Sequence, residues 1–153
     1  MMTKIQAIEL SAEKILQGNI TEAQTVMDTE YPFQKITAQA RKYTDKEKME
    51  QMIAYIKDTM VIKIKEEEVE MVAALALAMK SLVEKYGCQA AAIQCWNALQ
   101  TEIGIMPCAA NAILNEQGIP VVCETDIHGA VTALLAEAAG MDEKRGFFAD
   151  WTI

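Results

Sequence analysis

The residues best suited to chemistry lie in the stretch VVCETDIHGA, at positions 121–130. An apolar run there ends in two carboxylates, Glu124 and Asp126, and the only histidine of the chain, His128, follows two residues later. If extended backbone continues through this stretch, the two carboxylates point to the same face. Like charges that close repel each other unless a cation or a shared proton relieves them. Carboxylate oxygens suit Mg²⁺ or Mn²⁺, so the pattern indicates a candidate site for a divalent metal.

The same stretch also has a purely structural interpretation. Asp126 precedes a helical pattern and could cap that helix, with Glu124 in solvent. His128 would then sit in a first helical turn as a surface or capping residue, since no H-x-x-x-H or H-E-x-x-H companion exists. The glycines form no phosphate-binding loop. The only serines, Ser11 and Ser81, fall within helical patterns, which argues against a serine-histidine-aspartate triad.

Short apolar runs alternate with helical patterns in the second half of the chain. One of these helices is expected to begin at Asp126 and to end at Gly140. Alternation of this kind predicts βαβ units and a parallel sheet, and strands without polar alternation fit a sheet covered on both faces. The apolar runs are AAAIQCW at 90–96, IPVVCE at 119–124 and GFFADWTI at 146–153.

The first half of the chain has helical patterns throughout. One helix is predicted over 3–17. A second begins near Asp45, and its apolar stripe consists of Met49, Met52, Ile53 and Ile56. A third extends from the charge run KIKEEEVE to a cap at Gly87, and the residues on its apolar face are Val72, Leu75, Met79 and Leu82. We therefore predict one domain over 1–153, with a mainly helical part at 1–87 and a βαβ part at 88–153. Its expected class is α/β, with three layers, α/β/α, around a small parallel sheet.

The carboxyl ends of the predicted strands are where a site is expected, because open parallel sheets bind ligands beyond those ends. The side chains that gather there are Trp96 and Asn97 after the first run, Glu124, Asp126 and His128 after the second, and Asp150 and Trp151 after the third.

Composition excludes several classes of protein. The chain has 153 residues, is 52% hydrophobic and carries a formal charge of −8, so a folded domain is expected and a nucleic-acid or anionic membrane partner is not. No apolar run reaches the roughly 20 residues that a membrane span needs, and no signal peptide is apparent, so a cytoplasmic protein is expected. The four cysteines, which form no C-x-x-C pair, are interpreted as buried reduced thiols, with a disulfide or thiolate metal site as the alternatives. They are Cys88, Cys95, Cys108 and Cys123.

Several motifs together resemble the L-fucose isomerase family, especially its shorter isomerase-like members. They are AIQCW, PC, ILNEQGIPVVCETDIHGA and FFADW, within residues 64–153, and GIPVVCETD followed by FFAD is the most specific part. The resemblance implies conversion of an aldose to a ketose. In that chemistry a divalent cation, usually Mn²⁺, acts as Lewis acid and template on the sugar oxygens, while carboxylates move a proton through an enediol.

The resemblance also assigns roles to individual residues. The aspartate of the family's E-x-D turn corresponds to Asp126, which would be a metal ligand or an acid–base group. Glu124 would orient Asp126, bind the metal or contact the sugar. Trp96 would also contact the sugar. The family's upstream catalytic glutamate corresponds to Asn111 here, which cannot act as a base, and Glu102 is the candidate substitute. The family's histidine ligand comes from a separate C-terminal domain, so His128 does not match it.

The chain is thus expected to be the central α/β segment of a longer sugar isomerase. Alone it should bind Mn²⁺ or Mg²⁺ poorly or not at all and should be inactive. Its expected partners are a monosaccharide, the flanking domains of the same enzyme and further copies in a homo-oligomer. The alternatives are a non-catalytic sugar-binding or regulatory module on the same fold, and an assembly domain whose methionine-rich apolar helices form subunit contacts.

Overall fold

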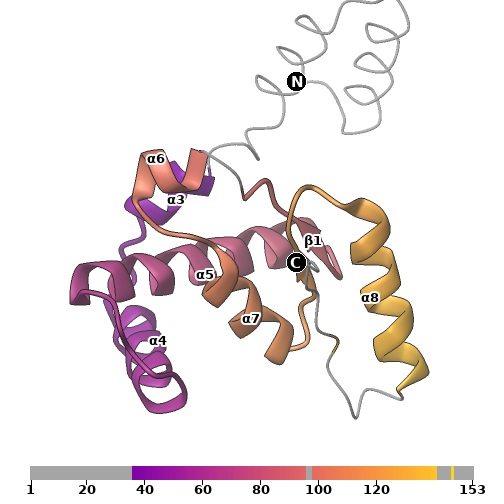
Figure 1. Cartoon of the computed structure of the whole chain (residues 1–153), viewed down its shortest axis with the longest axis horizontal. Coiled ribbons are helices and arrows are strands. Elements are labelled where there is room, and N and C mark those ends of the chain that lie inside the picture. The colour runs from indigo at the N-terminus through magenta and orange to yellow at the C-terminus, as the bar shows by residue number, and fades with distance from the viewer. Residues whose placement is uncertain (1–35, 96–97, 141–145, 147–153) are drawn as a thin grey trace, which may run out of the picture. The chain divides into compact units, whose positions relative to one another are not determined.

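The computed structural model describes residues 36–95, 98–140 and 146 (Figure 1). The chain divides into two units, Met1–Ile36 and Thr37–Ile153, and the account below concerns the second. The helix predicted over 3–17 lies outside the described residues, as does the third apolar run apart from Gly146. The number of domains therefore stays a prediction. The same is true of four predicted strand-end residues, Trp96, Asn97, Asp150 and Trp151.

The helix predicted from Asp45 onwards is present as α4 (Lys46–Thr59), which follows the short α3 (Ile36–Arg41). The Asp45 carboxylate accepts a hydrogen bond of 3.2 Å from the Lys48 backbone N–H and so caps the first turn. In the predicted apolar stripe, Met52 and Ile56 are fully buried, and the two other members are half-buried.

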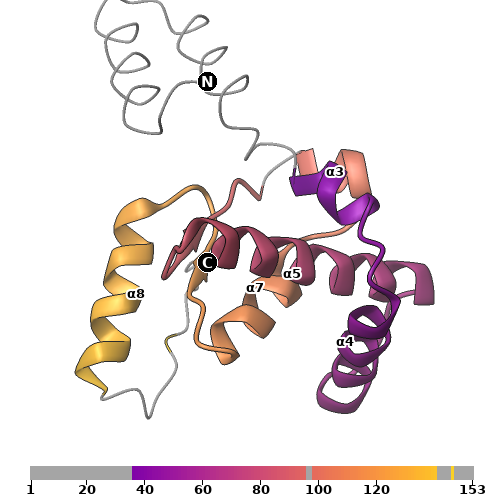
Figure 2. The same cartoon turned by 180° about the vertical axis from the view of Figure 1, so that it is seen from behind.

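Helix α5 (Glu66–Tyr86) is the centre of the described structure and packs against α4 and α7 (Cys108–Glu116), as Figures 1 and 2 show. The sequence predicted one apolar stripe along it. Instead, every residue from 72 to 79 is buried, which means that two helical turns are covered on all sides. The alanines between the larger side chains allow neighbouring elements to approach closely. The helix ends at Gly87, which adopts the predicted left-handed cap with φ of +62°.

A small parallel sheet forms from the first two predicted runs. Strands β1 (Ala91–Ala92) and β2 (Val121–Val122) pair in register, with Ala91 opposite Val121. The Ile93 N–H extends this ladder with a 2.9 Å hydrogen bond to the Val122 carbonyl. Between the strands come α6 (Ala98–Ile103) and α7, and α8 (Ile127–Ala139) follows β2. The predicted α/β class with a small parallel sheet is confirmed.

Helices on the sheet bury β2 almost completely, whereas both residues of β1 are half-buried. α7 contacts β2, and α8 contacts both strands, so Val121 and Val122 are each only 1% exposed. Burying such a side chain contributes about 1.5–3 kcal/mol relative to leaving it in water. These contacts alone do not define three complete layers, and that part of the fold stays a prediction. Within the described residues, no helix is both long enough and apolar enough to span a membrane.

Candidate functional site

The acidic turn, residues 123–126, leaves β2 at the edge of the sheet where a site was expected. Its Asp126 N–H donates to the Cys123 carbonyl at 3.2 Å. Between them, Glu124 and Thr125 have φ of +60° and +56°, the pattern of a type I′ turn. Extended geometry therefore ends before Glu124, so the condition under which both carboxylates would share one strand face is not met.

A contact with the neighbouring strand supports this unusual backbone. Left-handed conformation costs a residue other than glycine about 1–2 kcal/mol. The Thr125 N–H donates to the Ile93 carbonyl at 3.1 Å, just beyond the end of β1. The acidic turn is thus anchored to both strands, and its position relative to the sheet is set by backbone hydrogen bonds.

Asp126 is the N-cap of α8, as the structural interpretation of the sequence suggested. Its Oδ1 accepts a 2.9 Å hydrogen bond from the Gly129 N–H, which satisfies one of the donors that every helix start leaves unpaired. The negative charge is also favoured there by the helix dipole. The cap uses one carboxylate oxygen and leaves Oδ2 outside this hydrogen bond, on a side chain that is only half-buried.

The other acidic and histidine candidates are exposed. Glu124 lies in the acidic turn itself, and His128 lies in the first turn of α8, where its carbonyl accepts a 2.8 Å hydrogen bond from Thr132 Oγ1. The structure therefore brings Glu124 and Asp126 together within one turn and places His128 on the outer surface next to them.

Glu102 lies elsewhere. Its exposed carboxylate accepts a hydrogen bond from the buried Thr37 hydroxyl, and in Figures 1 and 2 its helix α6 lies beside α3 rather than beside α8. The structure thus places Glu102 against α3, and its proposed substitution for the family's glutamate stays a prediction.

Asn111, in contrast, reaches the acidic turn. It is 5% exposed, and its Nδ2 donates to Cys123 Sγ at 3.2 Å, although the two residues lie on α7 and at the end of β2. Its Oδ1 is buried without a hydrogen-bond partner in the described structure. An unpaired buried polar atom costs about 1–3 kcal/mol and is uncommon. Sequence reasoning treated Asn111 only as a lost base, and helical periodicity carried no signal for this contact.

The cysteines are free thiols, as predicted, but they are not uniformly buried. Cys95 is buried, Cys88 and Cys123 are half-buried, and Cys108 is exposed. Burial, followed by the neighbouring Cys95 and Cys108 thiols, raises the pKa of Cys123 to about 11. Two other thiols thus lie near Cys123, the first residue of the acidic turn, and the Cys123 thiol stays protonated at neutral pH.

The described residues do not complete a metal site by themselves. Across 36–95, 98–140 and 146, no group of three or more histidine, cysteine, aspartate or glutamate side chains is arranged to hold a metal ion. The acidic turn offers two carboxylates, of which one also caps a helix. A hard divalent cation takes six or more oxygen ligands, so further ligands would have to come from outside the described residues.

Part of the chain is similar to sugar isomerases. It is 33% identical over 58 residues to a sulfoquinovose isomerase from Alkalicoccus urumqiensis, which is 38% of this chain and 13% of that protein. Sulfoquinovose isomerases from Priestia aryabhattai and Priestia megaterium are 32% identical over 63 residues, 40% of this chain and 14% of theirs. The matched segment thus spans about one seventh of these relatives. No protein-family model and no solved structure matches the chain.

Proposed function

We propose that this chain forms part of the catalytic region of an aldose–ketose sugar isomerase of the L-fucose isomerase-like kind. Two lines of support are independent of each other. The partial similarity to sulfoquinovose isomerases supports the reaction class. The position of the acidic turn, at the carboxyl end of a strand in a parallel sheet, supports the placement of a ligand there. The second observation carries the proposal, because it concerns the residues themselves.

In this proposal the acidic turn is one wall of a sugar site. Asp126 supplies a ligand or acid–base oxygen through Oδ2, while the bond from Gly129 to Oδ1 holds the carboxylate in one orientation. Glu124 and Trp96 would contact the sugar. An anchored carboxylate loses little freedom when it engages a ligand, which favours both binding and catalysis.

A Mn²⁺ or Mg²⁺ ion would supply Lewis-acid chemistry in the complete enzyme. Because the described carboxylates do not complete its coordination, we assign this chain only part of the ligand set and propose that other regions of a longer enzyme supply the rest. Those flanking domains, a monosaccharide and further copies of the enzyme are the proposed partners. The chain alone is expected to bind metal weakly and to be inactive.

Metal titration tests this assignment. Calorimetry with Mn²⁺ should give weak heats with the wild-type chain and none with Asp126→Asn, which keeps a capping oxygen but loses the charge. Asp58→Asn, at an exposed position on α4, is the matched control for the change in net charge and should behave as wild type. Equal binding by Asp126→Asn and wild type would remove Asp126 from the site. Turnover of an aldose by the purified chain with Mn²⁺ would contradict the expected inactivity.

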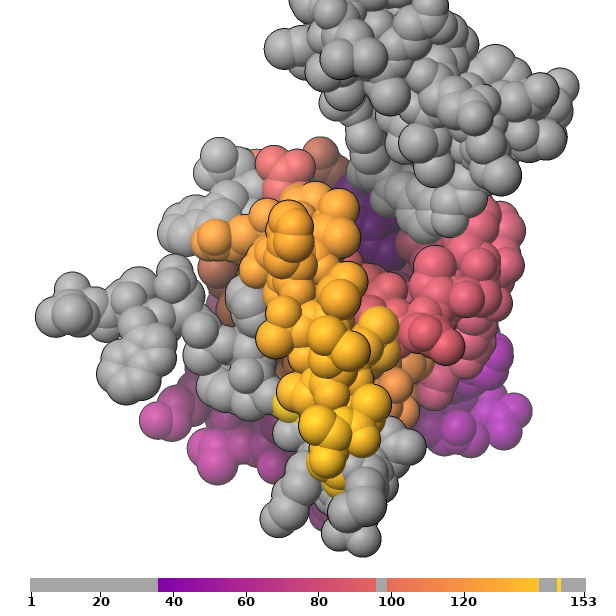
Figure 3. Space-filling view, turned by 90° about the vertical axis from the view of Figure 1, so that its right-hand side faces the viewer, coloured from indigo at the N-terminus to yellow at the C-terminus, as the bar shows by residue number. Residues whose placement is uncertain are grey.

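One observation favours an assembly role, although it concerns α8, which contains no methionine, and not the methionine-rich helices considered from the sequence. Helix α8 lies at the surface of the molecule (Figure 3). Three of its large apolar side chains are 66%, 51% and 66% exposed, and their spacing of four residues places them along one face of the helix. They are Ile127, Val131 and Leu135. Such a stripe is typical of a helix that packs against another surface. Sedimentation of the wild-type chain and of Leu135→Lys tests self-association through α8. If α8 forms the contact between copies, the lysine should weaken association relative to the wild-type chain.

A further inference from the structure

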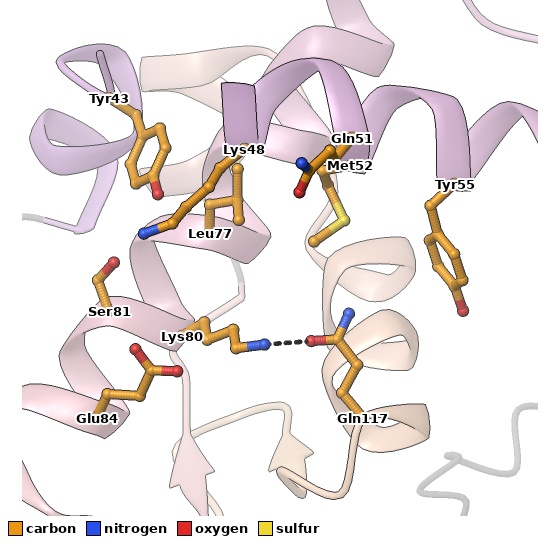
Figure 4. A pocket seen from close by; sticks show the side chains of 10 residues that line it. All are labelled: Tyr43, Lys48, Gln51, Met52, Tyr55, Leu77, Lys80, Ser81, Glu84 and Gln117. Carbon is orange, nitrogen blue, oxygen red and sulfur yellow. Dashed lines mark hydrogen bonds between the residues drawn. The ribbon is translucent and has the colours of Figure 1, made fainter. Parts of the chain in front are cut away.

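A hollow lies on the helical part of the described structure, away from the acidic turn. It has a volume of about 440 Å³ and opens between α4, α5 and the C-terminal end of α7, with the α3–α4 connection at its rim (Figure 4). That volume falls within the range of small-molecule sites, which is about 300–1,000 Å³. None of the residues of the acidic turn lines it.

The base of the hollow is apolar and its rim is polar. Met52 and Leu77, both buried, form part of the lining. Around them, hydroxyl, amide, ammonium and carboxylate groups converge on one space, as Figure 4 shows for Ser81, Glu84 and Gln117. An apolar surface with several convergent donors and acceptors suits a ligand that has both C–H faces and hydroxyl groups.

The charges around the hollow balance. The Lys48 ammonium lies 3.4 Å from the Asp45 carboxylate. The hydrogen bond and the negative charge of Asp45 raise the pKa of Lys48, and the negative charge of Glu84 raises it to a smaller degree. The Lys80 ammonium donates a 2.9 Å hydrogen bond to Gln117 Oε1 (Figure 4). The two ammonium groups are matched in number by the carboxylates of Asp45 and Glu84, so the formal charges at the hollow sum to zero and give no net positive field that would select an anion.

Two tyrosines complete the rim. Tyr43 and Tyr55 stand on opposite sides of the space in Figure 4, and the Tyr55 hydroxyl donates to the Glu116 carboxylate. Tyrosine offers a flat apolar ring together with a polar end, and it keeps few rotamers, so it supplies contact area at small entropic cost. Rings of this kind match the C–H faces of a cyclic polyol.

We infer that this hollow is a binding site for a neutral, hydroxyl-rich ligand the size of a monosaccharide. The proposal goes beyond the isomerase assignment and does not depend on it, because the hollow and the acidic turn share no residue. A ligand there would hold α4 against α5, so it would act on the helical part of the chain and not on the reacting atoms of a substrate.

The test is a titration of the ¹⁵N-labelled chain, followed by amide correlation spectra, with D-glucose, D-fructose and myo-inositol as probes. At least one of them should cause saturable shifts confined to residues around 48–55, 80–84 and 117, and sodium phosphate should cause none there. Ser81→Trp places bulk at an exposed position on the rim and should weaken binding by about tenfold or more. Ala138→Trp, exposed on α8, is the matched control and should bind as wild type.

Three results would overturn the inference. They are the absence of saturable shifts with all three polyols, binding of phosphate in their place, and unchanged binding in Ser81→Trp. If that variant fails to fold, Gln117→Ala, which removes a single exposed amide, should still reduce polyol affinity. Asp126→Asn should bind the polyol as wild type does, and this separates failure of the hollow from failure of the isomerase assignment.

Discussion

Replacing Asp126 separates its structural role from its proposed chemical role. The structure gives this side chain two stabilising effects, a 2.9 Å hydrogen bond to the Gly129 N–H and a negative charge at the start of α8. Loss of an N-cap oxygen typically costs about 1 kcal/mol. Loss of the charge costs about 0.3–1 kcal/mol. Asp126→Asn should therefore lose only the second amount, and Asp126→Ala should lose both, about 1.5 kcal/mol in all.

Urea unfolding of the three proteins measures these differences. With a slope of about 2 kcal/mol per molar urea, the midpoint should fall by about 0.7 M in Asp126→Ala and by about 0.3 M in Asp126→Asn. Added salt should shrink the deficit of Asp126→Asn, because it is electrostatic, and should leave most of the deficit of Asp126→Ala. Equal destabilisation of the two variants would refute the reasoning, since the asparagine retains an acceptor for Gly129.

Four further predictions concern other residues of the structure. Gly87→Ala should lower the free energy of unfolding by about 1 kcal/mol, because φ is +62° and an added Cβ would meet nothing within 4 Å, so that only backbone strain acts. Denaturation of Gly87→Asn is the check, since this variant is expected to lose less unfolding free energy than Gly87→Ala. Leu75→Ala, at a fully buried position on α5, should cost about 3–4 kcal/mol, and a loss below 1 kcal/mol by the same measurement would contradict the packing. Alkylation at pH 8 should modify exposed Cys108 well before Cys123, whose pKa is raised from 9.0 to about 11. The folded state keeps the Cys123 thiol proton to a higher pH than the unfolded state does. The stability that the protonated thiol contributes should therefore be complete below pH 9 and should disappear as the pH rises through about 11. Comparing wild type with Cys123→Ala across that range measures this contribution, and a flat difference would count against it.

Elements whose ends depend on local chemistry were predictable from the sequence. Asp45, Gly87, Asp126 and Gly140 were expected at helix ends, and each occupies that place. Caps depend on residues within one helical turn, so a few neighbouring letters carry the information. Alternation of apolar runs and helices likewise predicted the parallel pairing of the first two runs.

Features that depend on distant residues were not predictable in the same way. The spacing of apolar residues predicted a single apolar face on α5, and only the elements packed around the helix bury residues 72–79 throughout. Glu102 was considered only as a substitute for the family's upstream glutamate, and its hydrogen bond with Thr37, 65 residues before it, was not predicted. In both cases the residues that make the contact are distant along the chain, and no local sequence pattern identifies them.

The acidic turn shows where this division falls. The sequence by itself determined that two carboxylates follow an apolar strand and that one of them begins a helix. Local preference argues against positive φ at Glu124 and Thr125, since neither is glycine. Tertiary structure alone decided that conformation, because the Thr125 N–H finds its acceptor on Ile93, beside a strand some thirty positions earlier, and this bond together with burial of β2 outweighs the local cost.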